Sequence, residues 1–509
     1  MTDPRLDQAL SDERAGRFLE SFRHCLGVLG DNPRNAGALA LASRLSMLAG
    51  DAANAIAYAC EAVRIDTKHP EAQQALNVAR QARSATSEAI AAYSQAVDIE
   101  PEIALHVIAP GALVPFARME EAQRLLDEAL KHDPGLAQAH AAAANLALRK
   151  SEYLGALAGY QRAAFISGRA EYALALSEVL FSLNQHTAAD YYRDRALRKQ
   201  RLYPAHPSTD PTLKVLALMA PGPWSANAPL DFALDRHRVQ LSRLYLTESV
   251  PPETLQPYNT VINAIGEAEA AQGAIAIARS LSAQTPKTIL NDPAHSWKTE
   301  RTKLAAALQN VAGCRVPQTR RVKRDALTLE RNFPMVVRPV DSHGGRGAAK
   351  IESRTALAQY LNERPELRFD VAPFVEYRSA DGYYRKYRVA LVASAPYAYH
   401  LAISPEWLVH YIGSETPSTP WMQQEEERFL SDPASVFTNW SSVFPTIAQA
   451  LGLDYFAIDC SLLPTGEVLI FEADIASLIH CREPAGSYKY HCVPQIFAAL
   501  QGLLETSAR

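Results

Sequence analysis

The sequence lacks several features that would place it in a specialised class of protein. None of its apolar runs approaches the roughly 20 residues that a membrane-spanning helix needs, and its opening stretch, MTDPRLDQALSDERAG, has no basic segment followed by an apolar one. Only six of the 509 residues are cysteine, and they are scattered, unlike the dense disulfide frameworks of small secreted domains. We therefore predict a cytoplasmic protein with reduced thiols and no membrane contact.

Neither sign of charge is in marked excess. The chain has 51 Lys and Arg against 55 Asp and Glu, which gives a formal net charge of -4. Without a broad positive field, binding to nucleic acid is not expected. Hydrophobic residues make up 48% of the chain and charged residues 21%, as in soluble globular proteins, and its length suggests two to four domains.

The composition changes near residue 205. Before it the sequence is rich in Ala and Leu with helical periodicity; after it, β-branched and aromatic runs alternate with Pro and Gly. The stretch YPAHPSTDP at 203–211 carries three prolines in nine residues and cannot continue a helix. We predict a helical domain over 1–202, a linker over 203–212, and a second architecture beyond it.

The helical half repeats. An Ala, a bulky residue four positions on and a small residue three further recur, with starts 34, 33 and 34 residues apart. The copies are Ala55/Ala59/Ala62, Ala89/Tyr93/Ala96, Ala122/Leu126/Ala129 and Ala156/Tyr160/Ala163. This period resembles a tetratricopeptide-repeat array, so we predict an all-α solenoid of about five helical hairpins.

The resemblance implies that the array presents a concave surface to a peptide or protein partner. A purely structural role, or pairing with a second copy to form a homo-oligomer, is the alternative. A non-repeating helical bundle is the other architecture compatible with this composition.

Strands and helices alternate after the linker. Apolar runs at 213–220, 239–246, 260–265 and 288–291 predict strands, and an Ala-rich segment at 267–282 predicts a helix between the last two. Such alternation is typical of a small parallel sheet.

A glycine-rich loop follows the apolar strand FPMVVRP at 333–339, which carries Arg338. The loop reads DSHGGRG at 341–347 and leads into a second strand, AAKIES. Its glycines would let backbone amides approach a phosphate chain, and His343 and Arg346 would add positive partners. An ordinary glycine-rich hairpin turn is the alternative.

Three carboxylates lie in a predicted hairpin of strands at 455–463 and 467–474. Glu472 and Asp474 are two residues apart and share one face of their strand. A four-residue loop would place Asp459 diagonal to Glu472 on that face, whereas a three-residue loop would move it to the other face. Three crowded carboxylates predict a site for Mg²⁺, with Mn²⁺ as an alternative ion. A solvated acidic face paired with Lys or Arg is the alternative.

These pieces stand in the order found in ATP-grasp ligases, and residues of about 213–505 resemble that superfamily. The resemblance implies a preliminary α/β domain over 213–296, a small lobe with the phosphate loop over 297–372, and a large lobe with hinge and metal site over 373–509. The fold class expected of the chain is thus multidomain, an all-α solenoid followed by α/β and α+β parts. In the family, ATP is clasped between the two lobes.

The resemblance also implies roles for particular residues. The segment NDPAHSWKTERTKLAAALQNVAGCRVPQT resembles the family's entry to the small lobe, APFVEY its hinge, and AIDCS and IFEAD its metal strands. The implied cofactor-binding residues are Arg301, Lys303, Arg338, His343, Gly344, Gly345, Arg346, Gly347, Phe374, Val375 and Glu376. The implied catalytic residues are Arg338 and Arg388, and the implied metal ligands are Asp459, Glu472 and Asp474.

Two of these residues depart from the family pattern. Arg338 replaces a Lys, which keeps the charge but turns a point charge into a planar fork. Asp474 replaces an Asn and adds a negative charge to the metal site. We expect the first exchange to preserve phosphate binding and the second to tighten metal binding.

The function implied is an ADP-forming, ATP-dependent carboxylate–amine ligase acting through an acyl phosphate, as in peptide or natural-product biosynthesis. The carboxylate and amine substrates are not identified by the sequence, and the repeats would recruit a peptide or protein. The alternatives are a repeat scaffold whose ATP-grasp domain only binds nucleotide, and an ATP-grasp small-molecule kinase.

Several histidines and cysteines invite other interpretations. His480-Cys481 and His491-Cys492 form two adjacent pairs, but adjacent ligands point apart and do not predict zinc. We expect His480 and Arg482 to line the acceptor pocket.

Two further histidines and one cysteine lie in predicted strands. His400 and His410 alternate with apolar residues, which favours places in the core or in a pocket wall. Cys460 should face away from Asp459, and we do not predict it as a nucleophile.

Overall fold

The computed structural model describes residues 3–49, 51–99, 118–204, 211–235, 238–266, 269–340, 342, 345–410, 416, 418–477, 479, 488–489 and 491–508. The chain forms two compact units. The first unit contains helices α1 to α8, except residues 148–157 where α7 ends and α8 begins. The second unit contains residues 148–157 and the chain from Gly168 onward. Among the helices of these described residues, none has the length and hydropathy to cross a bilayer.

The first unit is entirely helical. Its helices are α1 (Pro4–Arg14), α2 (Phe18–Asp31), α3 (Ala36–Leu48), α4 (Ala52–Ile65), α5 (Pro70–Ile99), α6 (Met119–His132), α7 (Ala137–Arg149) and α8 (Tyr153–Ser167). All the predicted repeat positions are fully buried except Tyr93, which packs against the core from a partly buried position. Gly159 shows why small residues recur: a Cβ there would lie 2.9 Å from the Cβ of Ala144 on α7. The sequence period therefore marks the positions where helices meet.

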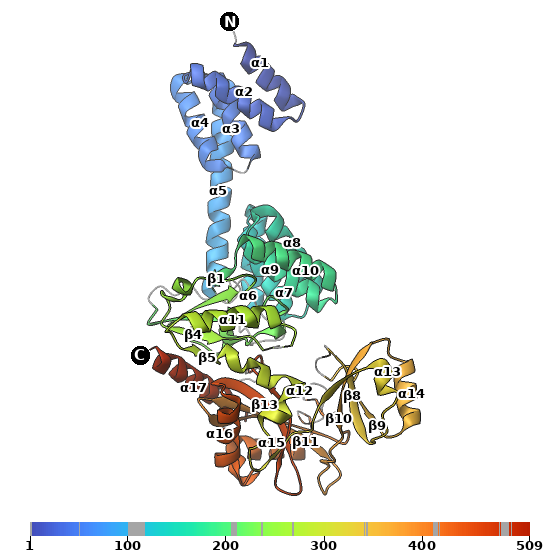
Figure 1. Ribbon diagram of the computed structural model, residues 1–509. Helices are drawn as coiled ribbons and strands as arrows, with labels where there is room; N and C mark the ends of the chain where they lie inside the picture. The colour runs from blue at the N-terminus through green and yellow to red at the C-terminus, as the bar shows by residue number, and fades with distance from the viewer. Residues whose placement is uncertain are drawn as a thin grey trace. The chain divides into compact units, whose positions relative to one another are not determined.

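Helix α5 departs from the predicted series of hairpins. A hairpin array needs a turn between the two helices of each repeat. Figure 1 shows instead one unbroken helix of 30 residues, Pro70–Ile99, which joins these two segments. No proline or glycine interrupts this stretch of the sequence, so nothing local stops the helix.

The second unit begins earlier than the predicted domain boundary at residue 202. Helices α9 (Ala170–Ser182) and α10 (His186–Lys199) belong to it. Ala170, Leu174 and Leu197 on these helices join a core with strands that follow. The predicted linker also starts too early, because Leu202–Pro204 forms strand β1, paired with β3. Residues 205–210 of the predicted linker lie outside the described part of the chain.

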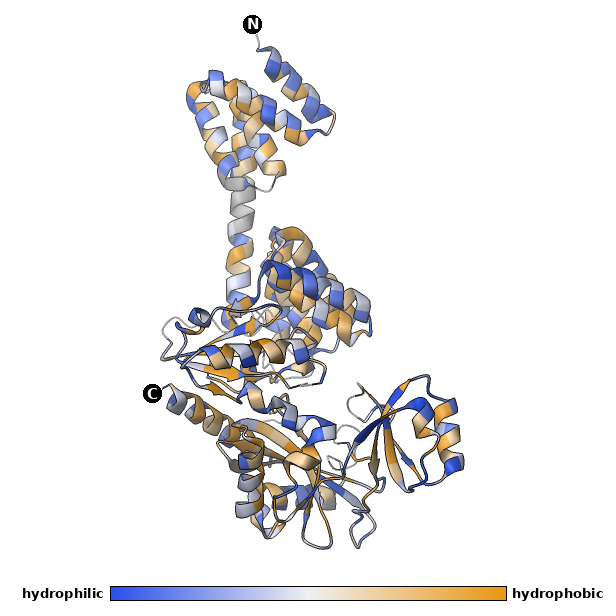
Figure 2. Ribbon diagram, viewed as in Figure 1, coloured by the Kyte–Doolittle hydropathy of each residue, from blue (hydrophilic) through white to orange (hydrophobic). Residues whose placement is uncertain are grey.

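The first sheet has the strand order β1-β3-β2-β4-β5, with β1 antiparallel and the other neighbours parallel. The parallel strands are β2 (Leu213–Met219), β3 (Val239–Tyr245), β4 (Thr260–Asn263) and β5 (Ile289–Leu290), and α11 (Gln272–Gln284) lies between the last two in sequence. These strands carry mostly hydrophobic residues (Figure 2), as expected for a sheet covered on both faces. The predicted parallel sheet is confirmed.

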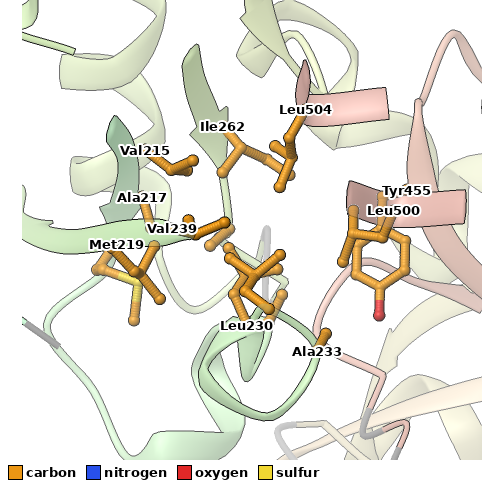
Figure 3. Packing of buried hydrophobic residues seen from close by; sticks show 14 of the residues in the cluster. Val215, Ala217, Met219, Leu230, Ala233, Val239, Ile262, Tyr455, Leu500 and Leu504 are labelled. Carbon is orange, nitrogen blue, oxygen red and sulfur yellow. The ribbon is translucent and has the colours of Figure 1, made fainter. Parts of the chain in front are cut away.

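The C-terminal helix α17 (Cys492–Ser507) covers one face of this sheet. Leu500 and Leu504 on α17 reach a core that contains Ile262 of β4 and Tyr455 of a later strand (Figure 3). The Thr260 hydroxyl donates a hydrogen bond of 2.8 Å to the Leu504 carbonyl oxygen. The other face packs on α11.

A four-stranded antiparallel sheet follows, in the order β7-β10-β8-β9. Its strands are β7 (Arg320–Lys323), β8 (Met335–Pro339), β9 (Ala349–Ile351) and β10 (Arg368–Pro373), with helices α13 (Arg324–Leu327) and α14 (Arg354–Asn362). Its core includes Val337 and Leu357. This sheet corresponds to the predicted small lobe.

The last sheet has the order β12-β11-β13-β14-β6. It contains β6 (Cys314–Arg315), β11 (Tyr384–Val392), β12 (Ala395–Ser404), β13 (Tyr455–Leu462) and β14 (Val468–Asp474), and α12 (Arg301–Ala307), α15 (Pro420–Ser431) and α16 (Trp440–Leu451) pack on one of its faces. Both β6 and α12 fall within 297–372, so the predicted small lobe begins too early: these residues pack with the large lobe. The reason is parallel pairing of β6 with β14, which the sequence did not indicate.

Candidate active site

A cavity of about 290 Å³ lies between the four-stranded and the last five-stranded sheet of the second unit. Its size is close to the lower end of ligand pockets, about 300 Å³. One part of the wall is charged and another is apolar. The ionisable lining residues are Arg301, Arg338, Asp370, Lys386, Arg388, His410, Asp459 and Glu472.

The carboxylates are brought together by a hairpin whose register combines a short loop and a bulge. The Leu463 amide donates a hydrogen bond of 2.9 Å to the Glu467 carbonyl oxygen, so the loop has three residues, 464–466, and not the four that would place Asp459 diagonal to Glu472. A bulge beyond Cys460 then shifts the register by one, and Asp459 pairs directly with Glu472. The two side chains share a face, as predicted, but through a register that the sequence analysis did not foresee.

Asp459 is held by two cations. It is only 3% exposed, and its carboxylate accepts a bidentate pair of bonds from Arg388, with Nε–Oδ1 2.6 Å and Nη2–Oδ2 2.9 Å. The Nζ of Lys386 donates a further bond of 2.9 Å to Oδ2. Burial would raise the pKa of Asp459, but Arg388 and Lys386 outweigh it and lower that pKa. Asp459 is therefore a charged group that both orients and neutralises Arg388.

Asp474 lies two residues beyond Glu472 and beside the cavity rather than in its wall. Its Oδ1 accepts a hydrogen bond of 2.8 Å from the Ala476 amide. Burial, and then the charge of Glu472, raise the pKa of Asp474 to about 6. Two carboxylates of this kind are the hard oxygen donors that Mg²⁺ prefers, so Glu472 and Asp474 fit a metal ion in their chemistry.

Asp459 does not fit the metal as it stands, since both of its oxygens are bonded to cations. In the described part of the chain, no group of three or more His, Cys, Asp or Glu side chains is close enough to hold an ion. Of the three predicted metal ligands, Asp459 is therefore paired with Arg388 and Lys386, and Glu472 and Asp474 are the two carboxylates that could hold an ion.

Arg338 projects from β8 into the cavity, as predicted. Its Nη2 donates to the Ser342 carbonyl oxygen, and its Nε donates 3.3 Å to the Ser342 hydroxyl, so the loop after the strand fixes the guanidinium. Burial, and then the charge of Arg301, lower the pKa of Arg338 to about 10. Two neighbouring cations partly shielded from water favour an anionic ligand.

The glycine-rich loop meets the large lobe at Gly345. Its φ of +69° lies in the left-handed region that favours glycine, and a Cβ would lie 2.3 Å from Nε2 of His410. Gly347, at φ +71°, comes close to Pro339. The loop can approach the cavity only because these positions lack side chains. His343 and Gly344 lie outside the described residues.

The apolar part of the cavity surrounds the hinge after β10. Phe374 contacts Trp407 edge to face, with ring centroids 5.8 Å apart, and Lys350 lies over the Phe374 ring at 4.3 Å. Val336 of β8 and Leu469 of β14 add aliphatic surface from the two lobes. A flat apolar ring system would find hydrophobic walls here, and charged groups for its substituents at the other part of the cavity.

The structure places eight of the predicted residues in the wall of this one cavity. They are Arg301, Arg338, Gly345, Phe374, Val375, Arg388, Asp459 and Glu472. Three others are exposed and do not line it: Lys303, Arg346 and Glu376. Of Arg301 and Lys303, therefore, Arg301 alone lines the cavity. The Glu376 carboxylate caps the Arg378 amide at 3.0 Å instead of reaching inward.

Two residues of the cavity wall were missed by the sequence analysis, Lys386 and Trp407. Lys386 could have been found, because it precedes Arg388 by two residues on a predicted strand and so shares its face. Trp407 follows β12 in irregular chain, where no period indicates direction. His410 lies in the cavity wall, which is one of the two places predicted for it. Burial, and then the charge of Lys386, lower the pKa of His410.

Other predicted positions behave as core. His400 is buried, and burial with the nearby charge of Arg388 holds its pKa well below the usual range. Cys460 is fully buried in the core on the face opposite Asp459, as predicted. Cys492 begins α17, whereas His480, Cys481 and Arg482 lie outside the described residues.

No protein-family model and no curated protein matches the chain. Among solved structures, it is similar to a RimK-domain ATP-grasp protein of Sphaerobacter thermophilus at 14% identity, covering 57% of this chain and 99% of that one with a TM-score of 0.33. It is also similar to a D-alanine–D-alanine ligase of Coxiella burnetii at 12% identity, covering 58% of this chain and 96% of that one with a TM-score of 0.35.

A D-Ala:D-Ser ligase of Enterococcus faecalis is similar at 13% identity over 58% of this chain and 100% of that one, with a TM-score of 0.36. A tetratricopeptide-repeat protein of Thermus thermophilus is similar at 20% identity over 39% of this chain and 90% of that one, with a TM-score of 0.16. These structures are of the two kinds that the sequence resembles, ATP-grasp ligases and tetratricopeptide-repeat proteins. Each of these four TM-scores is below 0.5, so these similarities carry no argument about the function of the chain.

Proposed function

We propose that the chain is an ATP-dependent ligase that activates a carboxylate as an acyl phosphate and joins it to an amine, releasing ADP and phosphate. The observation that supports this most is the convergence of Arg301, Arg338, Arg388 and Glu472 on one cavity whose other part is apolar. These residues come from segments up to 171 positions apart in the sequence, and a solvated acidic face would not gather them around a hollow.

The charged part would bind the phosphates. Three cations line it: Arg338 on the small lobe, Arg301 on α12 and Arg388 on β11. Asp459 holds the guanidinium of Arg388 by two bonds, so that it stays in one orientation while charge develops on the transferred phosphoryl group. Removing such a contact costs about 10² to 10³ in rate.

A magnesium ion at Glu472 and Asp474 would supply charge neutralisation for the phosphate oxygens when bound. The chain itself contributes the positions of the reacting groups. The carboxylate oxygen of the substrate attacks the γ phosphorus and ADP leaves; the amine then attacks the acyl carbon, and the phosphate leaves with that oxygen.

The apolar part would hold the base. Phe374, Trp407 and Val336 supply hydrophobic surface, and the hinge backbone at 374–375 lies in the wall. We further propose that the helical repeats recruit a peptide or protein that carries one substrate.

The second candidate is a scaffold whose ATP-grasp domain binds nucleotide without turnover. The ion pairs on Asp459 favour it, because a carboxylate already matched by Arg388 and Lys386 has less need of a metal ion. ADP formation separates the two functions. The protein, ATP and Mg²⁺ are incubated with pooled amino acids and peptides, and with the same pools after acetylation of the amines or amidation of the carboxylates as controls. A ligase forms ADP over many turnovers only when both groups are free, whereas the scaffold forms none and a kinase needs only one acceptor.

A further inference from the structure

A second cavity lies in the second unit, away from the residues described above. It measures about 320 Å³ and opens where α9 begins, α10 ends and β1 pairs with β3. None of the proposed nucleotide-binding or metal residues lines it. Its polar wall is formed by Arg169, Glu171, Lys199, Gln200, Tyr203 and Arg243.

The charges of this wall are unequal. Arg169 pairs with Glu171. Arg243 pairs at 2.7 Å with Asp231, which does not itself line the cavity. Lys199 donates a hydrogen bond of 2.6 Å to the Gly168 carbonyl oxygen, and no described carboxylate forms an ion pair with it. Three cations against two carboxylates leave one positive charge in excess.

The start of α9 adds to this excess. The helix has 13 residues, and no side chain caps its N-terminus at Arg169. Ala170 and Glu171, its first residues, lie in the cavity wall. The amide groups of a helix start carry partial positive charge, about half a unit in total, and bind oxyanions.

Arg243 is the residue that requires a ligand. Its side chain is 7% exposed, and it lies opposite Tyr203 on the sheet face that carries Val239 and Leu241, both in the hydrophobic core. Its Nε is buried and has no hydrogen-bond partner among the described residues, although buried polar groups are nearly always paired. A buried guanidinium with a free donor, in the wall of a cavity with excess positive charge, has the properties of an anion-binding group.

We propose that this cavity binds a small molecule through an oxyanion group, a carboxylate or a phosphate. The oxyanion lies between Arg243, Lys199 and the start of α9. The cavity is far larger than one oxyanion needs, since a water molecule occupies about 30 Å³ of the liquid, so the remaining volume takes the body of the ligand against Tyr203 and Pro204. This site is separate from the proposed ligase reaction and does not depend on it.

The test is calorimetric titration of the full chain with inorganic phosphate and, separately, with succinate, in the presence of saturating ADP and Mg²⁺. Binding of either anion is expected, and the anion that binds identifies the chemical group. Lys199→Gln and Arg169→Gln, both at exposed positions, should each weaken binding about tenfold or more, because each removes a charged donor.

Arg198→Gln is the matched control, since Arg198 is also exposed on the last turn of α10 but does not line this cavity. It should leave the affinity unchanged, and all three variants should keep the thermal unfolding temperature of the parent. Failure of both anions to bind at millimolar concentration overturns the proposal. So does binding that responds equally to all three substitutions, or to none.

Discussion

Glu472→Gln should separate the chemistry of the cavity from its stability. Glu472 lines the cavity, and among the described residues no ion pair involves it. Its charge is a cause of the raised pKa of Asp474. Neutralising it should therefore relieve a repulsion in the folded state while removing a ligand for the metal that accompanies ATP.

The expected size of the effect follows from these contacts. Loss of one charged contact to the transferred phosphoryl group lowers the rate by about 10² to 10³, which is about 3 to 4 kcal/mol of barrier. The free energy of unfolding should stay the same or rise slightly. Asp459→Asn gives the contrast, because it leaves the buried Arg388 without its counter-ion and should cost about 3 to 5 kcal/mol of stability in addition to activity.

Both variants can be measured by ADP formation at saturating ATP and by urea unfolding. The reasoning predicts that Glu472→Gln is inactive and stable, and that Asp459→Asn is inactive and destabilised. Turnover at the parent rate in Glu472→Gln would refute the role of Glu472, and equal destabilisation of the two variants would refute the ion-pair assignment.

Three other predictions test separate parts of the structure. Gly345→Ala should weaken ATP binding about tenfold or more, as measured by calorimetry, because the added Cβ would meet His410. Gly382→Ala is the control: its φ is +90°, but no described atom lies within 4 Å of the added Cβ. This variant carries the backbone strain without the clash and should bind ATP normally. Burial raises the pKa of Glu178 to about 7, above its unfolded value, so its contribution to the free energy of unfolding falls by about 3 kcal/mol as the pH rises from about 4.5 through 7. Glu178→Gln should abolish this loss when urea unfolding is compared at pH 5 and pH 8. An unchanged pH dependence in the variant would disprove the assignment. Removing Mg²⁺ with EDTA should stop ADP formation without lowering the unfolding temperature, since Glu472 and Asp474 are not required to hold the two lobes together; a lowered unfolding temperature would indicate a structural metal instead.

The sequence predicted the parts of the fold that follow from local pattern. The period of 33 to 34 residues identified buried positions such as Ala122 and Tyr160, because small residues are needed where helices meet. The period could not show that α5 continues through the expected turn between two helices. A helix continues wherever no residue ends it, and the spacing of the repeats does not report on such residues. The early start of the second unit depends on packing of α9 with residues far along the chain, which no local pattern records.

The candidate site was predicted where spacing alone decides direction. Glu472 and Arg388 lie on the strand faces that the sequence predicted, but the partner of Asp459 depended on two features that compensate each other, a short loop and a bulge. Lys386 was overlooked although the same alternation places it beside Arg388. Glu376 and Arg346 were carried over from the family and proved exposed, because the direction of a hinge or loop side chain is set by tertiary contacts.

The central claim is that a substrate carboxylate is activated as an acyl phosphate in the cavity around Arg388. The most direct measurement follows ¹⁸O from labelled carboxylates. The protein is incubated with ATP, Mg²⁺ and a pool of ¹⁸O-carboxyl-labelled amino acids and peptides, and the released phosphate is analysed by mass spectrometry, with Glu472→Gln as control. The account predicts one ¹⁸O atom in each phosphate released by the parent and none above background in the variant; unlabelled phosphate, or ADP formed without phosphate release, would contradict it.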